Sequence, residues 1–493
     1  MTATTLDQLQ TVNSFAALPE AFYTRLQPQP FKNAPRLLHA NPAAAALIGL
    51  DPSVLSMPDF LAAMSGSAPL PGGDSLAAVY SGHQFGVWAG QLGDGRAHLL
   101  GEVAGPNGNW ELQLKGSGKT PYSRMGDGRA VLRSSVREYL AGEAMHGLGI
   151  PTTRALALVV SEDRVVRETV ETAAVVTRMA PSFVRFGSFE HWASRKETGH
   201  LQTLADYVID RFYPQCRDAA GGEAGSPVSR MLTEVTARTA RLMADWLSVG
   251  FCHGVMNTDN MSILGLTLDY GPYGFMDGFN AGHICNHTDS GGRYAWNVQP
   301  SVAHWNLNRL AAALHSLEPD TDTLRAALDS YEAVFLARWH ERLGNKLGLG
   351  QWLPEDEGLF DELLRLMHES RADFTLSFRR LAQAPAGEHA PFLDLFIDRE
   401  AAAAWIGSYT ARIARDGRPD AERVAQMNGS NPLYVLRNHL AEQAIQAAAQ
   451  GDPSEIDTLT RLLRDPWQAQ PGAEDYAAPA PDWAADLEVS CSS

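Results

Sequence analysis

The sequence predicts an α+β protein whose first part is rich in strands and whose second part is helical. Two runs of alternating apolar and polar residues, Leu99–Val103 and Trp110–Lys115, are joined by the turn Gly105-Pro-Asn-Gly-Asn109, which is typical of a β-hairpin. From Leu201 onward the apolar residues recur at helical spacing. A strand-rich region followed by a helix-rich region indicates a bilobal layout.

The other elements follow from the same two periodicities. Residues 34–39 predict a short strand that leads into a small helix, and residues 130–146 predict an amphipathic helix that ends at Gly147. Further short strands are expected at 153–160, 164–169 and 173–177. Further helices are expected at roughly 201–213, 227–249, 305–316, 322–343, 356–383, 398–415 and 434–449. The domains expected are an N-terminal extension with a strand-rich lobe (1–180), a helical lobe (181–470) and a flexible tail (471–493).

The composition fits a globular protein without a nucleic-acid or membrane partner. Forty basic and 57 acidic residues give a formal net charge of −17, which repels nucleic-acid backbones and anionic membranes. The N-terminus lacks the features of a signal peptide and no apolar run approaches about 18 residues, so a cytoplasmic location is expected. The four cysteines form no Cys-x-x-Cys pair, which argues against a zinc site.

The segment from His253 to Gly271 carries the most informative motif. Protein kinases have a His-x-Asp sequence, an Asn seven positions after that His, and then an Asp-Phe-Gly turn. Here Asn260 keeps that spacing and Asp269-Tyr-Gly follows, so two oxygen ligands for a nucleotide-bound metal are present. Val255 occupies the position of the catalytic Asp and cannot accept a proton. The motif predicts a bilobal protein-kinase-like fold with an altered nucleotide site.

A second interval supports the same fold. Gly93-Asp-Gly95 precedes Lys115 by about the distance that separates the Gly-rich turn of a kinase from its phosphate-binding Lys. The third Gly of a full Gly-x-Gly-x-x-Gly is missing, and a Gly-Asp-Gly alone is more often only a tight turn. A helical Glu should pair with Lys115. Glu143 lies near the apolar stripe of the helix and Glu138 lies off it, so periodicity leaves both candidates open.

Several longer motifs resemble one known family. They are the run Lys115-Gly-Ser-Gly-Lys-Thr-Pro-Tyr-Ser-Arg-Met-Gly-Asp-Gly-Arg-Ala-Val-Leu-Arg-Ser-Ser-Val-Arg-Glu138, Gly82-His-Gln-Phe-Gly86, His253-Gly-Val-Met-Asn-Thr-Asp-Asn-Met261 and the terminal Cys491-Ser-Ser493. Over nearly the whole chain they resemble the selenoprotein O family, whose animal members have selenocysteine in place of Cys491. The family comprises kinase-fold proteins, once classed as pseudokinases, that transfer AMP from ATP to hydroxyl side chains of proteins. The resemblance implies a protein adenylyltransferase.

The resemblance also implies a role for individual residues. Those that would contact the nucleotide phosphates are Gly93, Gly95, Arg96, Lys115 paired with Glu138, Asp127 and Gly128. ATP would lie reversed relative to a kinase, so that the α-phosphate faces the acceptor and pyrophosphate leaves. Arg178 and Arg185 would supply cations where a kinase holds adenine, although from sequence alone each is more often a surface residue.

The remaining roles concern the metal and the base. Asn260 and Asp269 would hold Mg²⁺ or Mn²⁺, and Asp269 would also bind the nucleotide. Asp259 would receive the acceptor proton, and its structural alternative is an Asp that caps a turn. Two other functions are possible for such a site: a non-catalytic nucleotide-binding pseudokinase, which Val255 would favour, and a kinase that acts through Asp259. The protein substrates and the choice between ATP and another nucleotide such as UTP are left open.

The cysteines suggest regulation. Cys491 lies in a polar tail, where core packing does not explain a cysteine, and Cys285 lies where a kinase keeps its activation loop. We hypothesise a reversible disulfide between Cys285 and Cys491 that lowers activity until it is reduced. The alternative is that Cys491 is a free thiol and Cys285 only packs.

Overall fold

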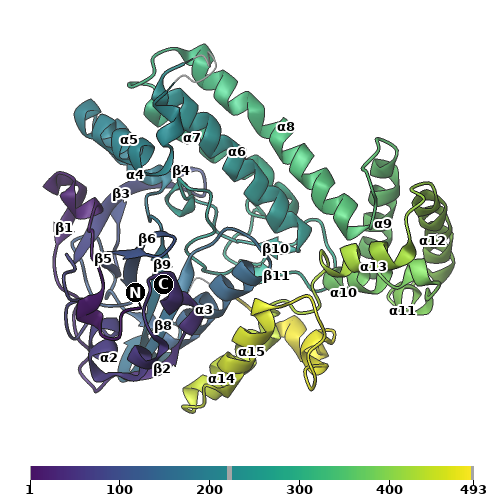
Figure 1. The fold of residues 1–493 in the computed structure, drawn as a ribbon, viewed down its shortest axis with the longest axis horizontal. Helices are drawn as coiled ribbons and strands as arrows, with labels where there is room; N and C mark the ends of the chain where they lie inside the picture. The colour runs from purple at the N-terminus through teal and green to yellow at the C-terminus, as the bar shows by residue number, and fades with distance from the viewer. Residues whose placement is uncertain (1, 219–224, 490–493) are drawn as a thin grey trace.

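The structure, a computed structural model, describes residues 2–218 and 225–489. Figure 1 shows an antiparallel sheet formed by the N-terminal part of the chain, in purple and blue, and helices formed by the teal, green and yellow parts. The predicted α+β class is therefore confirmed. Within the described ranges, no helix is both long enough and apolar enough to cross a membrane.

The sheet has the strand order β1-β3-β5-β6-β9-β8-β2, with β4 paired to β3 and β7 paired to β9. Its strands are β1 (Tyr23–Arg25), β2 (Arg36–Ala40), β3 (Leu76–Gln84), β4 (Val87–Gly93), β5 (Ala97–Gly105), β6 (Gly108–Lys115), β7 (Ala130–Val131), β8 (Arg154–Val166) and β9 (Val170–Ala180). The predicted hairpin is the β5–β6 pair, which runs from Gly105 opposite Gly108 to Ala97 opposite Lys115. Lys115 therefore stands at the end of β6 that is remote from the turn.

The three short strands predicted after the first long helix are wrong in number. Residues 153–160 and 164–169 are not separate strands, because β8 runs without a break over 154–166 and residues 167–169 form the turn before β9. The register of β8 with β9 shifts between Ser161 and Arg164, and a β-bulge of this kind interrupts the alternation of side chains without ending the strand.

Helices make up most of the chain after residue 180. The α-helices are α1 (Pro42–Leu47), α2 (Pro58–Met64), α3 (Leu132–Gly147), α4 (Phe186–Ser194), α5 (Thr198–Phe212), α6 (Pro227–Ser248), α7 (Gln299–Leu314), α8 (Thr321–Lys346), α9 (Asp356–Ser370), α10 (Phe374–Leu381), α11 (Ala390–Leu393), α12 (Arg399–Ala414), α13 (Asp420–Asn428), α14 (Asn438–Ala449) and α15 (Ser454–Arg464). The single helix predicted over 356–383 is wrong. It breaks at Arg371, which has a left-handed φ of +50°, and α10 begins anew with Asp373 accepting a hydrogen bond from the backbone N–H of Leu376 (2.8 Å). The sequence did not predict α2, α4, α11, α13 or α15.

Two cores cover the two faces of the sheet. Along β9, Ala174 and Val176 point into the core shared with α3, whereas Val175 and Met179 point into the core under α1 and α2. The first core continues into α6, α7 and α14, so the sheet and the helical region share one apolar interior. Helix α3 is therefore fixed between the sheet and α14 and α15, as Figure 1 shows.

A short antiparallel pair holds the segment that carries the central motif. β10 (Phe251–Cys252) pairs with β11 (Gly274–Phe275), and residues 253–273 form the loop between them. His253 follows β10 directly and is buried: its ring stacks on Trp246 of α6, and its Nε2 lies 2.9 Å from the carbonyl oxygen of Leu268. His253 thus ties the two halves of this loop together.

Candidate active site

A cleft of about 990 Å³ lies between the sheet and the 253–273 loop. Its walls contain every residue predicted to bind nucleotide or metal or to act as base except Glu138: Gly93, Gly95, Arg96, Lys115, Asp127, Gly128, Arg178, Arg185, Asp259, Asn260 and Asp269. The cleft is at the upper end of the volumes common for small-molecule sites, and it can accept a nucleotide. Residues spread over 177 positions of sequence thus meet at one site.

The structure distinguishes between the two Glu candidates on α3. Glu138 Oε2 lies 2.5 Å from Nζ of Lys115. Glu143 is fully buried farther along the helix and pairs with Arg154 instead, at 2.7 and 2.9 Å. Burial lowers the pKa of Lys115, and Glu138 opposes that effect by favouring the charged ammonium.

Arg178 and Arg185 are buried in the cleft wall and are not surface residues. Each side chain is only 3% exposed, and both bind the carboxylate of Asp269, Arg178 through Oδ1 and Arg185 through Oδ2. Arg178 also donates to Glu138 (2.9 Å), and Arg185 donates to the backbone oxygen of Asp259 (2.7 Å). Burial alone would raise the pKa of Asp269, but Arg185, Arg178 and Lys115 outweigh it and hold the pKa well below its usual value.

Asp259 lies in the 3₁₀ turn Thr258–Asn260 and is nearly buried. Its Oδ2 accepts a hydrogen bond from Nε2 of Gln84 (3.1 Å). Burial raises the pKa of Asp259 to about 6, although Arg185 and Gln84 favour the ionised form. A carboxylate with such a pKa is mostly ionised at neutral pH and is suited to accept a proton.

The residues of the cleft fit a divalent ion bound together with a nucleotide. The side-chain nitrogen of Asn260 donates to the carbonyl of Val255 (3.0 Å), which leaves the amide oxygen as its available ligand atom. Each oxygen of Asp269 binds one guanidinium and retains a further lone pair. The described residues contain no group of three or more His, Cys, Asp or Glu side chains that could hold a metal alone. Two protein oxygens completed by phosphate and water match the usual Mg²⁺ site of a nucleotide enzyme.

The Gly-rich turn after β4 is held by the 118–128 loop. The hydroxyl of Thr120 donates to the carbonyl of Asp94 (2.7 Å), and the ring of Tyr122 occupies the space beside Gly93. Gly128 has a φ of +76°, and a Cβ there would lie 2.2 Å from the backbone of Gly118. Both glycine positions therefore allow a close approach between the two loops.

Some cleft residues were not predicted. The guanidinium of Arg185 lies over the ring of Tyr80 (4.7 Å), and Arg167 forms an ion pair with Asp127 (2.8 Å). Gln84 belongs to the Gly82-His-Gln-Phe-Gly86 motif, which marked the segment without indicating a role for the amide. Arg167 carried no sequence signal, because it lies in the turn after β8 and reaches Asp127 only in the folded chain.

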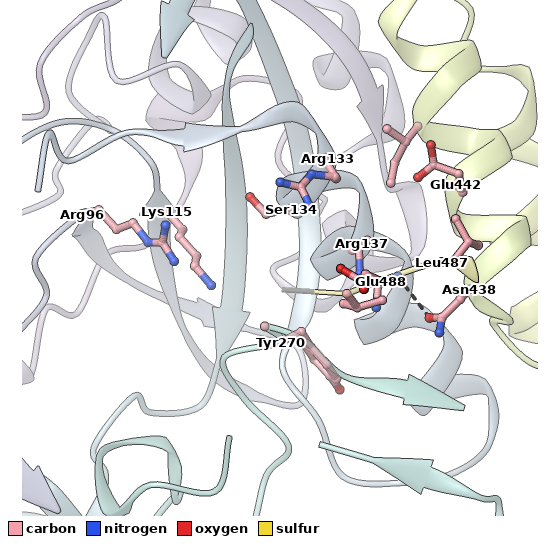
Figure 2. Close-up of a pocket in the computed structure, with 13 residues that line it drawn as sticks. Arg96, Lys115, Arg133, Ser134, Arg137, Tyr270, Asn438, Glu442, Leu487 and Glu488 are labelled. Atoms are coloured by element: carbon pink, nitrogen blue, oxygen red, sulfur yellow. Dashed lines mark hydrogen bonds between the residues drawn. The ribbon is translucent and has the colours of Figure 1, made fainter. Parts of the chain in front are cut away.

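A smaller pocket of about 130 Å³ adjoins the cleft and shares Arg96, Lys115 and Gly271 with it. Figure 2 shows Arg133 and Arg137 of α3 and Asn438 and Glu442 of α14 around this pocket. Leu487 and Glu488 of the C-terminal segment also line it, with Glu488 beside Arg137. The described part of the predicted tail therefore reaches the neighbourhood of the active site.

The same segment also approaches the position of Cys285. The carbonyl oxygen of Val489 lies 3.2 Å from Nδ1 of His287, two residues beyond Cys285. The thiol of Cys285 donates to the carbonyl of Cys252 (3.3 Å), and burial raises the pKa of Cys285 well above its usual value. Cys491 lies outside the described residues.

Comparison with known proteins identifies the family. The family model described as "Protein adenylyltransferase SelO" matches residues 5–464. The chain belongs to the SelO family. It is 72% identical over 488 residues to "Protein nucleotidyltransferase YdiU" of Bordetella avium and 71% identical over 491 residues to that of Bordetella parapertussis, with 99% of each chain covered. The protein of the same name from Dechloromonas aromatica is 54% identical over 490 residues, covering 98% of this chain and 97% of its own. The SelO resemblance predicted from the sequence is confirmed.

We expect the Gly-rich turn to bind ATP, and a substitution at Gly93 tests this expectation. Gly93→Ala should weaken ATP binding by at least about tenfold, or about 1.4 kcal/mol. The reason is that a Cβ at this position would lie 2.5 Å from Cγ of Tyr122. The matched control is Gly90→Ala on the same strand, which also has a positive φ (+74°) but open space around the new methyl group. Isothermal titration calorimetry with ATP and Mg²⁺ measures both variants, and equal losses would contradict a specific effect of the Tyr122 contact.

Proposed function

We propose that this SelO-family chain transfers AMP from ATP to Ser, Thr or Tyr hydroxyls of proteins and releases pyrophosphate. Its family makes it an ATP-using nucleotidyltransferase. The observation that carries the proposal is the pair of buried guanidinium groups, Arg178 and Arg185, in the cleft that also holds Asp259. Two fixed multi-donor cations suit a departing polyphosphate, and a carboxylate near them suits an incoming hydroxyl.

In this proposal the acceptor oxygen bonds to the α-phosphorus of ATP as the bond from that phosphorus to the pyrophosphate oxygen breaks. Asp259 takes the proton of the acceptor hydroxyl, the role that Val255 cannot fill. The polyphosphate would be bound by Lys115, Arg96 and the Gly93–Gly95 turn. The nucleotide would also contact Asp127 and Gly128, which line the same cleft. The Lys115–Glu138 pair keeps the ammonium charged and directed into the site.

Asn260 and Asp269 would hold Mg²⁺ or Mn²⁺. A bound divalent ion would neutralise phosphate charge and stabilise the leaving pyrophosphate. The oxygen-only ligand set favours either of these ions over softer metals.

The fold itself is proposed to be protein-kinase-like. Three features support this: the Lys115–Glu138 pair between a sheet strand and a helix, the short β10–β11 pair around the 253–273 loop, and the positions of Asn260 and Asp269 in one cleft. In a kinase the same parts occur in the same chain order.

The first prediction concerns which phosphate is transferred. ATP labelled at the α-phosphate should label protein, whereas ATP labelled at the γ-phosphate should not, because the proposed leaving group contains the γ-phosphate. The measurement is radiolabel on protein after gel separation, with Asp259→Ala as the negative control. Comparable incorporation of γ-label would indicate a kinase, and no incorporation of either label would indicate a non-catalytic nucleotide-binding protein.

A second prediction separates the base from the metal ligand. Asp259→Ala should lower turnover by about 10²–10⁴-fold while ATP still binds. Asp269→Ala should abolish transfer and also weaken metal-dependent ATP binding, since the bridging cation loses a ligand. Calorimetry with ATP and Mg²⁺ compares the two variants. Equal losses of ATP affinity would show that the two roles are not divided in this way.

We also propose that a reversible disulfide between Cys285 and Cys491 lowers activity. The support is the position of Val489 against His287, which brings the tail to within two residues of each cysteine in sequence. Forming this disulfide from two thiols passes two electrons and two protons to a thiol oxidant such as oxidised glutathione. Because the pKa of Cys285 is raised, the thiolate that attacks the disulfide of the oxidant would be that of Cys491, and the sulfur of Cys285 would then displace the glutathione thiol.

Oxidised protein should yield a linked peptide containing residues 285 and 491 on digestion without reductant, and dithiothreitol should raise its AMP-transfer activity. Mass spectrometry and the α-label assay measure the two effects. The matched control is Cys216→Ala, because Cys216 is buried at another site and should leave the response to reductant unchanged. If Cys491→Ala responds to dithiothreitol as strongly as the unmodified protein, the disulfide is not the switch.

A further inference from the structure

The turn Gly82-His-Gln-Phe-Gly86 lies directly on the loop that carries Asp259. Three hydrogen bonds join the two segments: His83 N to Thr258 Oγ1 (2.7 Å), Gln84 Nε2 to Asp259 Oδ2 (3.1 Å) and Phe85 N to Asn257 Oδ1 (3.1 Å). Each residue from 257 to 259 therefore has a partner in the end of the β3–β4 hairpin. Only the contact of Gln84 is made to a group that the proposed reaction uses.

The carboxylate of Asp259 is held through one oxygen only. Oδ2 accepts the hydrogen bond from Gln84, whereas Oδ1 is buried and has no hydrogen-bond partner in the described part of the chain. A buried acceptor left without a donor is unfavourable. Because Oδ1 is closed to solvent, the hydrogen bond from Gln84 to Oδ2 is the one side-chain contact among the described residues that fixes the orientation of the carboxylate.

The space beside Oδ1 depends on Gly82. A Cβ at position 82 would lie 3.1 Å from Oδ1 of Asp259 and 3.0 Å from Oγ1 of Thr258, closer than ordinary contact. The φ of Gly82 is outside the left-handed region, so its backbone would accept another residue. The requirement for glycine at this position comes from the neighbouring carboxylate.

We propose that Gln84 is a positioning residue for AMP transfer. Its amide fixes the rotation of the Asp259 carboxylate, so that this group keeps one orientation in the cleft that it lines. The proton of the acceptor hydroxyl moves to this carboxylate as the acceptor oxygen bonds to the α-phosphorus and pyrophosphate leaves. Without the amide, the terminal torsion of the Asp259 side chain would take a wide range of angles. The carboxylate would then spend less time in the orientation that accepts the proton. The inference rests on the proposed function of Asp259.

Gln84→Met tests this role, because Met keeps the length of the side chain and lacks the donor. The assay measures transfer of label from α-labelled ATP to casein, a hydroxyl-rich probe protein. The kcat of this transfer should fall by about 10–100-fold, as expected for a misplaced catalytic group. The Kd for ATP with Mg²⁺ should stay within about twofold, since Gln84 binds Asp259 and not Asp269. The matched control is Val87→Ala in the same hairpin, whose side chain is 71% exposed and which should leave both values unchanged.

A double variant shows whether Gln84 acts through Asp259. In the Asp259→Ala background, Gln84→Met should cause no further loss of the residual transfer, because the group that it positions is absent. A further loss of similar size would overturn the inference, as would a wild-type kcat in Gln84→Met or a loss of ATP affinity that accounts for its defect. Gly82→Ala should reproduce the kcat loss by crowding Oδ1. Absence of α-label transfer by the wild-type protein would overturn the proposed function itself, whereas normal transfer by Gln84→Met overturns only the role of Gln84.

Discussion

A buried chain of charges joins the parts of the active site. Lys115 of β6 binds Glu138 of α3, Glu138 binds Arg178 of β9, and Arg178 and Arg185 both bind Asp269. Taking charges out of water is costly, and removing one partner of a buried pair commonly costs about 3–5 kcal/mol. These ion pairs therefore fix the sheet, α3 and the 253–273 loop relative to one another. A large movement of any of the three would leave a buried charge without its partner.

The same series of buried ion pairs explains how the cleft could receive a polyphosphate. The carboxylate of Asp269 is an anionic partner shared by Arg178 and Arg185, and those cations hold its pKa well below the usual value. In the proposed complex, ATP with a divalent ion would bring both a second anion and a cation to this group. The guanidiniums would then share or exchange an anionic partner, and no new charge would have to be buried on binding.

The sequence predicted the parts that depend on local pattern. The β5–β6 hairpin, α3 and the spacing of Asn260 and Asp269 all follow from periodicity or motif, and these residues meet in one cleft. Periodicity alone could not choose between Glu138 and Glu143, because both lie on the buried part of α3 and only their partners in other strands differ. The family resemblance implied Glu138, and the contact with Lys115 confirms that pairing. Arg178 resembles a surface residue in sequence, since its burial depends on Glu138 and Asp269 from distant segments. The single strand β8 was divided in two because its bulge interrupts the alternation of side chains.

The altered motif in the 253–273 loop also explains why the orientation of Asp259 depends on the β3–β4 hairpin. In a kinase the proposed base would stand two positions after His253, where Val255 now lies, and His253 itself is tied to Leu268 across the loop. Asp259 instead lies next to Asn260, in a 3₁₀ turn that provides no side-chain partner for its carboxylate. Its orientation must therefore come from another segment. The β3–β4 hairpin provides that contact through Gln84, and its second strand, β4, leads to the Gly93–Gly95 turn. One element of the sheet therefore contacts both the proposed base and the proposed phosphate site.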